Sequence, residues 1–386
     1  MLRFALAVAL LCSACSGLFE PNGVRWIDGS DESRIHHSSV LNVRWTKQLA
    51  EEQGGPYVPV ENASAAFDPI RNRVYIGSAD GRFYAFGSSG RQFFHYDPGA
   101  GIESAAAVDT TLGRIFLAAE DGRVHALEPD GEVRWVESAE GPVRQSPLLG
   151  DEVLYLTRED DAVVAMNREN GEIFWTYKRE GTVEFSISGH AGLMMAAGYL
   201  ITGFSDGTVV ALNPADGTVA WERTTAVDVE PEEGETRQFF DADATPVLHG
   251  GVLYAAGFSA GLYALDPASG TVLWREPELK TITGLAASGR MLITTSAQDG
   301  VRCFDLQRRE VAWSSPIENG APSTPVIATP YVLVGEALGS LRALRIQNGG
   351  EVSRIDLGTG FSGAPLAYGR YGFVISNGGR LVAFVI

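Results

Sequence analysis

The chain has 386 residues, of which 45% are hydrophobic and 20% charged, and its formal net charge is −18. Phosphate backbones are bound by clustered Lys and Arg, and the sequence has no basic stretch interleaved with aromatic residues, so the composition argues against nucleic acid as a partner. The length would allow two domains, but a repeat that runs from about residue 41 to the end predicts one.

Residues 1–14 have the plan of a secretory signal peptide. Arg3 precedes a short apolar core, residues 4–11, which is too short to span a membrane as a helix. The sequence therefore predicts export from the cytoplasm.

Residues 11–17 resemble a bacterial lipobox, with cleavage after Ala14 and a lipid on Cys15, although Cys12 stands where Leu is usual. Several acyl chains would give stable attachment to a membrane. The alternative is an ordinary signal peptide that releases a soluble periplasmic protein. Residues 15–40, rich in Gly, Asp, Ser, His and Asn, are then expected to be the lipidated Cys and a tether.

From residue 41 to residue 386 one hairpin pattern occurs eight times: a short apolar strand, a tight turn and a second apolar strand. Asp-Gly and Gly-Gly supply the positive φ angles of such turns, and the flanks alternate as strands do. The turns lie at Asp80-Gly81, Asp121-Gly122, Asp160-Asp161, Asp206-Gly207, Ala260-Gly261, Asp299-Gly300, Leu338-Gly339 and Gly378-Gly379.

A second signature follows most hairpins: a turn that ends in Gly, then a short strand with an inward-facing Trp. It is complete or recognisable at Trp135, Trp175, Trp221, Trp274 and Trp313. A Ser/Thr-Pro or small-residue strand precedes most hairpins, so one unit has four short strands. Four strands in roughly 40 residues is the period of a propeller blade. We therefore predict an all-β fold, an eight-bladed β-propeller of four-stranded antiparallel blades.

The chain ends directly after the eighth hairpin, so the last blade lacks its outer strand. Residues 41–45, Leu-Asn-Val-Arg-Trp, have the sequence of such a strand. Pairing this N-terminal strand with the last blade would close the ring and remove an exposed sheet edge.

The polar residues suggest no catalytic or metal site. None of the six His residues has a second His or Cys at metal-ligand spacing, and the recurring Asp-Gly carboxylates are explained by turn formation. Cys303 lies in a hairpin strand and is expected to be a small buried residue. We predict no enzymatic activity, no cofactor and no metal.

The pattern Asp-x-x-x-Gly-x-x-x-Trp resembles the tryptophan-docking repeat of dehydrogenases that use pyrroloquinoline quinone (PQQ). Those enzymes usually also carry an adjacent pair of Cys residues and a calcium-bound set of carboxylates, and this chain has no Cys-Cys pair. The resemblance implies a PQQ-like blade architecture without the cofactor. A PQQ-dependent periplasmic dehydrogenase remains an alternative.

Two neighbouring links between blades are long. The link from Trp221 to Pro246 is about twice as long as that from Trp135 to Pro147, and the link after Trp175 is also long. Both join an outer strand to the next inner strand, so they emerge on one face from neighbouring blades. Loops on a rigid scaffold are the usual place for binding residues.

The first long link contains Phe185, Ile187 and Ser188, and the second is an acidic run that ends in Phe239-Phe240 and continues to Asp241, Ala242 and Asp243. Charge mixed with apolar anchors is typical of binding patches. Two interpretations stay open: the aromatic side chains bind a partner, or they pack back into the blades while the acids are solvated.

The lipoprotein signal, the tether, the eight blades and the two long neighbouring links together resemble the BamB family. This family is the propeller lipoprotein of the outer-membrane β-barrel assembly (BAM) complex, and the resemblance covers nearly the whole chain. It implies a non-catalytic scaffold, anchored by lipid on the periplasmic face of the outer membrane. The implied partner is a POTRA domain of a BamA-like subunit, with nascent outer-membrane proteins as a further one.

The resemblance assigns the contact with that domain to Phe185, Ile187, Ser188, Asp241 and Asp243. Ser188 stands where the family has Arg, and this change removes a charge-assisted contact. A PQQ-like propeller that binds another envelope partner therefore remains an alternative.

Overall fold

The computed structural model describes residues 40–50, 61–179, 190–228 and 239–386. The predicted signal peptide, Cys15 and nearly all of the tether lie outside these residues.

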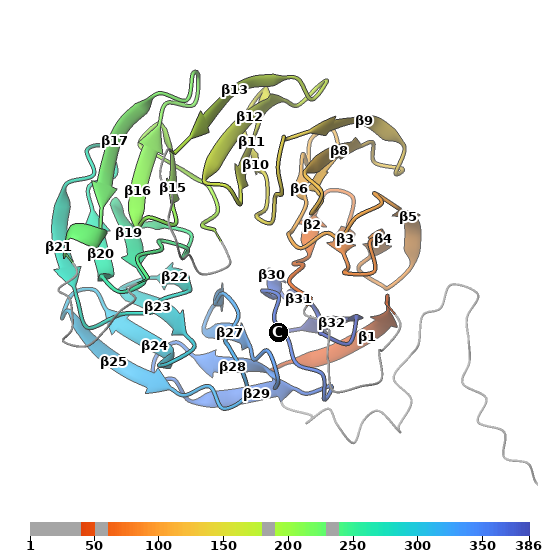
Figure 1. The fold of residues 1–386 in the computed structure, drawn as a ribbon. Coiled ribbons are helices and arrows are strands. Elements are labelled where there is room, and N and C mark those ends of the chain that lie inside the picture. Colours follow the sequence, from red (N-terminus) through yellow and green to blue (C-terminus); the bar gives the residue numbers. More distant parts are fainter. Residues whose placement is uncertain (1–39, 51–60, 180–189, 229–238) are drawn as a thin grey trace, which may run out of the picture.

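Eight four-stranded antiparallel sheets surround a central axis, as Figure 1 shows. In each sheet the first strand along the chain lies innermost, except that the last sheet takes its outer strand from the N-terminus. The first four blades are formed by β2 (Ala66–Asp68), β3 (Arg73–Gly77), β4 (Phe83–Gly87) and β5 (Gln92–Tyr96); β6 (Ala107–Val108), β7 (Ile115–Ala118), β8 (Arg123–Leu127) and β9 (Val133–Ser138); β10 (Leu148–Leu149), β11 (Val153–Arg158), β12 (Ala162–Asn167) and β13 (Ile173–Lys178); and β14 (Met194–Ala196), β15 (Tyr199–Gly203), β16 (Thr208–Leu212) and β17 (Val219–Thr224).

The last four blades continue the ring, and a short 3-10 helix, η1 (Ala226–Asp228), follows β17. Their strands are β18 (Val247–His249), β19 (Val252–Gly257), β20 (Gly261–Leu265) and β21 (Val272–Glu276); β22 (Gly284–Ser288), β23 (Met291–Ser296), β24 (Gly300–Asp305) and β25 (Glu310–Ser315); β26 (Val326–Ala328), β27 (Tyr331–Gly335), β28 (Leu341–Arg345) and β29 (Glu351–Ile355); and β30 (Leu366–Tyr368), β31 (Tyr371–Ile375), β32 (Arg380–Val385) and β1 (Asn42–Gln48).

The N-terminal strand closes the ring. β1 pairs antiparallel with β32, from Asn42 opposite Val385 to Gln48 opposite Arg380. The prediction of an eight-bladed propeller closed in this way is confirmed. The pairing leaves the C-terminal strand inside a sheet and not at its edge.

Burial explains why the hairpin strands read as apolar runs. The third strands β4, β16 and β20 are buried along their whole length, because each blade is covered on both sides by its neighbours. The outer strand β13 instead alternates between half-buried and exposed residues. Each hydrophobic cluster joins two adjacent blades; for example, Phe116 of blade 2 packs in one cluster with Leu154 of blade 3.

The recurring element of the blade junctions is an aromatic residue of the outer strand, which is present at every junction except that of blades 7 and 8. The indole nitrogens of Trp135, Trp175 and Trp221 each donate a hydrogen bond of 3.1 Å to a backbone carbonyl of the next blade. Each ring also covers a Gly in that blade, where an added Cβ would collide with the ring. The Gly of the repeat is therefore needed both for its turn and for the space it leaves.

At the junction of blades 5 and 6, the Trp side chain packs on an Arg and not on a Gly. The turn before β25 has Arg309 in place of Gly, with a φ of 56°. Its guanidinium lies 5.3 Å from the ring centroid of Trp274 in the preceding blade. A cation–π contact thus replaces the packing of indole on Gly at this junction.

The strand order divides the ends of the propeller into two faces. The starts of the innermost strands, the hairpins between second and third strands, and the links between blades share one end, which we call the link face. The turns that receive the Trp side chains lie on the opposite face. Both long links therefore belong to the link face.

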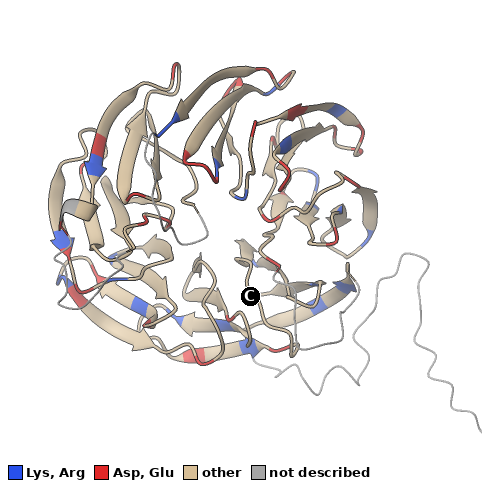
Figure 2. Ribbon diagram, in the orientation of Figure 1, with Lys and Arg blue, Asp and Glu red and all other residues tan. Residues whose placement is uncertain are grey.

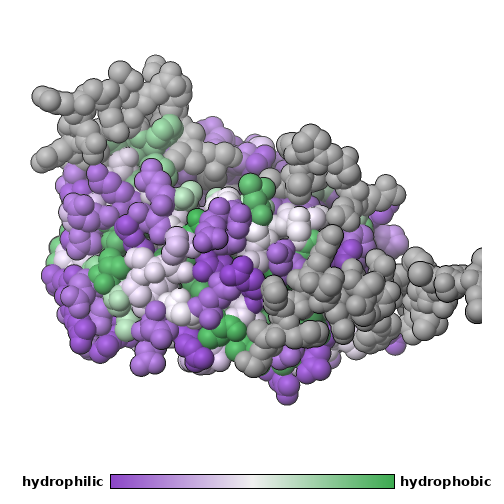
Figure 3. All heavy atoms as spheres, turned by 90° about the horizontal axis from the view of Figure 1, so that it is seen from below, coloured by the Kyte–Doolittle hydropathy of each residue, from purple (hydrophilic) through white to green (hydrophobic). Residues whose placement is uncertain are grey.

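The exposed surface is mixed in character. Among the described residues, Lys and Arg are spread around the ring (Figure 2). On the side seen in Figure 3, hydrophobic residues stand in small groups among hydrophilic ones. In the described part of the chain, no helix has the length and apolar character needed to cross a bilayer.

The docking of Trp221 predicts a specific cost for filling its Gly partner. Gly270 has a φ of 66°, and an added Cβ would collide with the Trp221 ring, whereas Gly369 has a φ of 59° and open space around it. We expect Gly369→Ala to lower the free energy of unfolding by about 1–2 kcal/mol through the backbone alone. Gly270→Ala should lower the free energy of unfolding by about 1–3 kcal/mol more than Gly369→Ala does, because the added Cβ overpacks the contact with the Trp221 ring. Urea denaturation followed by Trp fluorescence measures both, and equal losses would contradict the docking role.

Candidate functional site: the link face and the channel mouth

Of the predicted partner-binding residues, the structure describes Asp241 and Asp243. Phe185, Ile187 and Ser188 lie outside the described residues, as does Cys15, the predicted lipidation site. The assignment of all five partner contacts stays a prediction.

Asp241 is buried, with 1% of its surface exposed, although a contact residue was expected to face outward. Its carbonyl accepts a hydrogen bond of 2.8 Å from the backbone of Phe258, and the next residue, Ala242, donates one of 3.1 Å to the carbonyl of Phe204. The segment thus connects the hairpin turns of blades 4 and 5. The close approach of Ala242 is accommodated by Gly203, because a Cβ there would overlap the Ala242 backbone.

The aromatic pair at the end of the second link is half-buried. Phe239 packs edge to face on Phe258, with ring centroids 6.2 Å apart. Its backbone carbonyl accepts a hydrogen bond of 2.7 Å from Ser259. For Phe239 the structure therefore supports packing against the blade, one of the two interpretations that the sequence left open.

Among the described carboxyl groups of the link face, that of Asp243 has the pKa that is raised furthest. Its Oδ1 atom is buried and has no hydrogen-bond partner among the described residues. Burial, followed by the negative charges of Asp241 and Asp161, raises the pKa of the Asp243 carboxyl to about 8. At neutral pH the Asp243 side chain is therefore mainly protonated and uncharged.

Asp161, His190 and Ser205 form a polar network beside Asp243. Asp161 Oδ1 accepts hydrogen bonds from the backbone N–H (3.1 Å) and the hydroxyl (3.2 Å) of Ser205. Nδ1 of His190 lies 3.5 Å from the same Asp161 oxygen. It also lies 3.5 Å from the Ser205 hydroxyl oxygen. A catalytic triad needs the serine and the carboxylate at different nitrogens of the imidazole. This network instead ties the hairpin of blade 4 to that of blade 3.

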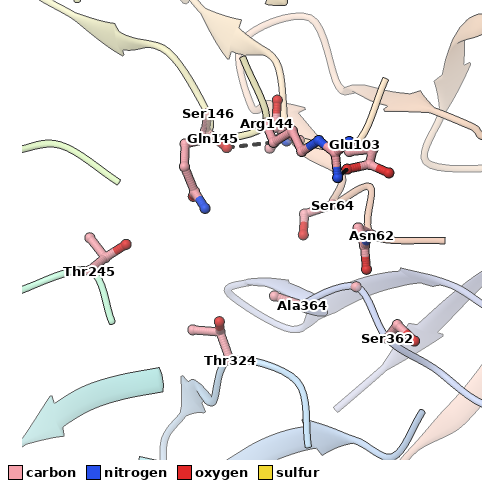
Figure 4. Close-up of a pocket in the computed structure, with 13 residues that line it drawn as sticks. Asn62, Ser64, Glu103, Arg144, Gln145, Ser146, Thr245, Thr324, Ser362 and Ala364 are labelled. Atoms are coloured by element: carbon pink, nitrogen blue, oxygen red, sulfur yellow. Dashed lines mark hydrogen bonds and ion pairs between the residues drawn. The ribbon is translucent and has the colours of Figure 1, made fainter. Parts of the chain in front are cut away.

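A cavity of about 410 Å³ lies at the mouth of the central channel (Figure 4). Its walls are the residues just before the innermost strands, so it opens on the link face. Most of these residues are hydroxyl or amide side chains, such as Asn62, Ser64, Gln145 and Thr324. The sequence showed the Ser/Thr residues at these strand starts, but not that they converge on one cavity.

The charged part of the cavity wall is a group centred on Arg144. Its guanidinium lies 2.8 Å from a carboxylate oxygen of Glu159, 3.4 Å from one of Glu103 and 3.8 Å from one of Glu120. Burial and the adjacent Glu120 raise the pKa of Glu103 to about 7. Sequence analysis missed this group, because its members come from separate turns.

The residues that line the cavity do not fit PQQ, a flat and acidic quinone. None of them is aromatic, so a planar ring has no stacking partner, and Arg144 is already engaged by three carboxylates.

Metal binding also lacks a basis in the described residues, where no group of three or more His, Cys, Asp or Glu side chains could hold an ion. His125 is buried, its Nδ1 lies 2.9 Å from the Tyr96 hydroxyl, and burial lowers its pKa to about 4. The Cys303 thiol is buried as expected, and its burial raises its pKa to about 12. Both side chains are structural.

Asp243 predicts a pH-dependent stability. Its pKa is about 8 in the folded protein and about 3.9 in an unfolded chain, so the folded state binds more protons between these values. The free energy of unfolding should therefore fall as the pH rises through this window. Asp243→Asn cannot ionise. We therefore expect the free energy of unfolding of this variant, relative to that of the parent, to rise by about 1–3 kcal/mol when the pH is raised from 5 to 8.5.

Chemical denaturation at the two pH values checks this expectation. Glu278→Gln, which removes a carboxylate from an exposed position, is the control and should show no such gain. A difference between Asp243→Asn and the parent that stays constant with pH would show that Asp243 does not titrate in this way.

Comparison with known proteins places the chain in a family. A family model described as "Outer membrane protein assembly factor BamB" matches residues 89–315, more than half of the chain. The chain is 25% identical to the outer membrane protein assembly factor BamB of Burkholderia pseudomallei over 353 residues, which cover 89% of this chain and 88% of the relative. It is 26% identical to the protein of the same name from Yersinia pestis over 257 residues, 66% of this chain and 64% of that relative.

Solved structures share the fold. BamB from Moraxella catarrhalis superimposes with a TM-score of 0.76 at 20% identity, covering 90% of this chain and all (100%) of that one. A quinohemoprotein alcohol dehydrogenase from Comamonas testosteroni gives a TM-score of 0.69 at 16% identity, covering 94% of this chain and 78% of the enzyme. At these identities the likeness shows the propeller alone.

The two bacterial relatives are named as assembly factors and not as enzymes, in agreement with the predicted absence of catalysis. The match of the family model is consistent with the resemblance seen in the repeats and links of the sequence. The chain belongs to the family of the outer membrane protein assembly factor BamB.

Proposed function

We propose that the protein is a lipid-anchored periplasmic scaffold of an outer-membrane protein assembly complex, and that it binds a POTRA domain of a BamA-like subunit through the two long links. The observation that carries this proposal is the family match over residues 89–315. It agrees with the distribution of Lys and Arg, which in the described residues are spread around the ring (Figure 2).

The described ends of the first long link are firmly held. Arg179, at its start, forms ion pairs with Asp206 and Glu222, and its backbone donates a hydrogen bond of 3.0 Å to the carbonyl of Asp161. His190, at its end, lies 2.5 Å from the Glu159 carbonyl through Nε2. A loop with fixed ends loses less conformational freedom when it binds a partner.

The second long link is held in the same manner. Asp228, at its start, pairs with Arg223 at 2.5 Å and accepts a hydrogen bond of 2.9 Å from the Tyr263 hydroxyl. Its end is held by Phe239 and by the Asp241–Ala242 segment. Both links therefore start and end on rigid parts of blades 3 to 5, which supports a binding surface that spans them.

The burial of Asp241 and Asp243 changes the role that we propose for them. Asp241, at 1% exposure, is not accessible to direct contact with a partner in this conformation. We assign to both residues the positioning of the second link, and to Phe185 and Ile187 the direct apolar contact. Nascent outer-membrane proteins are a further proposed partner.

The links can be tested by affinity purification of the membrane-extracted protein, with partners identified by mass spectrometry. We expect a BamA-type barrel subunit to be recovered. Phe185→Ala with Ile187→Ala should weaken this association about tenfold or more, as expected for truncated apolar anchors at an interface. Phe174→Ala, which truncates a half-exposed Phe on outer strand β13, is the matched control and should have no effect.

Ser188→Arg separates the two remaining interpretations. If the partner is the BamA-like subunit, restoring the guanidinium should strengthen the association by a charge-assisted contact. Recovery of another envelope protein, unaffected by all of these variants, would refute both the partner and the patch.

The proposed lipid anchor makes a separate prediction. Cys15→Ser removes the thiol that would carry the lipid, so the protein should move from the membrane fraction to the soluble periplasmic fraction. Immunoblots of fractionated cells measure this, with Cys303→Ser as the control that keeps the anchor. Membrane attachment that is unchanged by Cys15→Ser would contradict lipidation at this residue.

A further inference from the structure

The channel mouth offers a ring of hydrogen-bonding groups that the proposed scaffold function does not use. Hydroxyl side chains line the cavity from six of the eight blades: Ser64, Ser104, Ser146, Thr245, Thr324 and Ser362. Asn62 and Gln145 add two amides. Figure 4 shows the labelled members of this set spaced around the opening. Hydroxyls and amides both donate and accept, so the ring can serve both groups of a peptide bond.

Ser104 shows that the hydrogen bonding of this wall is incomplete. Its surface is 5% exposed, and its hydroxyl has no hydrogen-bond partner among the described residues. A buried hydroxyl without a partner costs free energy, and a bound group that reaches it would recover this cost.

The charged group at the wall is unbalanced: Glu103 and Arg144 line the cavity, and two more carboxylates lie behind them. Glu103, Glu120 and Glu159 all pair with one guanidinium, that of Arg144. Glu120 also lies close enough to Glu103 to raise the pKa of the Glu103 carboxyl, which is raised first by burial. A second cation at this position would relieve the repulsion between the carboxylates.

We propose that the channel mouth binds an extended peptide segment that carries a Lys or Arg side chain. The basic group pairs with the carboxylates around Arg144, and the hydroxyl and amide ring binds the peptide groups. The cavity volume of about 410 Å³ lies within the range of about 300–1,000 Å³ that is usual for small-ligand sites. Since no aromatic residue is among those that line it, the wall has no stacking surface for a sugar ring or a nucleobase.

The test uses the purified propeller without any assembly partner, so its outcome does not depend on the proposed scaffold function. The probe is the N-acetylated, C-amidated pentapeptide Gly-Ser-Lys-Ser-Gly, measured by isothermal titration calorimetry at pH 8, where Glu103 is mainly ionised. Its counterpart contains acetyl-lysine. We expect the Lys peptide to bind about tenfold more tightly than the acetylated one. Equal affinities, or no binding of either, would overturn the proposal.

Two charge variants are expected to change the affinity for the Lys peptide in opposite directions. A general loss of stability would not produce this result. Glu103→Gln should weaken binding of the Lys peptide about fivefold to tenfold, and Arg144→Gln should strengthen it by a similar factor. Glu318→Gln, an exposed carboxylate on the same face and outside the cavity wall, should leave the affinity unchanged. Changes of the same sign in the first two variants would overturn the assignment of the carboxylates.

Thr324→Trp provides a steric test from an exposed position at the start of β26. The large ring should fill the opening and abolish peptide binding without disturbing a blade core. n-Butylamine, which has the ammonium group but no peptide, should bind at least about tenfold more weakly than the Lys peptide. Retained binding in Thr324→Trp, or n-butylamine as tight as the peptide, would overturn the proposal.

Discussion

The structure depends on the docking of an aromatic ring from one blade onto the backbone of the next. At most junctions the ring is an indole that packs on a Gly and donates to a carbonyl, as Trp221 does with Gly270 and Pro267. Because the contact involves backbone groups, it needs only a Trp on one side and a Gly on the other. It therefore recurs around the ring while the remaining residues of each blade vary.

Some junctions lack part of this contact between an indole, a Gly and a backbone carbonyl. Phe94 of blade 1 covers Gly131 without an indole nitrogen. At the junction of blades 7 and 8, Ser353 accepts a hydrogen bond of 3.0 Å from the backbone of Leu41. Trp45 of the closing strand then donates at 2.7 Å to Ser88 of blade 1. The last two contacts fix the N-terminal strand on both sides, and the second of them is the same indole docking that joins other blades.

A rigid ring allows one face to carry carboxyl groups whose charged form is disfavoured by burial. Glu61, Glu103 and Asp243 all have pKa values raised to about 7 or 8, mainly by burial, and all lie on the link face. On the opposite face, Asp109 is paired with Arg168. Incomplete satisfaction of buried polar groups is expected where a scaffold binds other molecules, because there local stability is not the only constraint. The link face thus carries these raised carboxyl pKa values as well as the long links.

The chain alone determined the architecture, because each blade is specified by short-range signals. Asp-Gly turns with positive φ, such as that at Gly81, and a Trp at a fixed offset from the next Gly require no knowledge of distant residues. Closure by residues 42–48 was also predictable, since a missing outer strand at one terminus matched a spare one at the other.

Only the tertiary structure decided how the link face is arranged. The sequence suggested that Asp241 faces a partner, but the segment fills the space between two hairpin turns and buries it. Nor does any local pattern bring Glu103, Glu120 and Glu159 to one Arg144, because these residues come from separate turns and links in two neighbouring blades. Repeats encode strands and turns within each blade, whereas burial and charge at the channel depend on how eight blades meet around one axis.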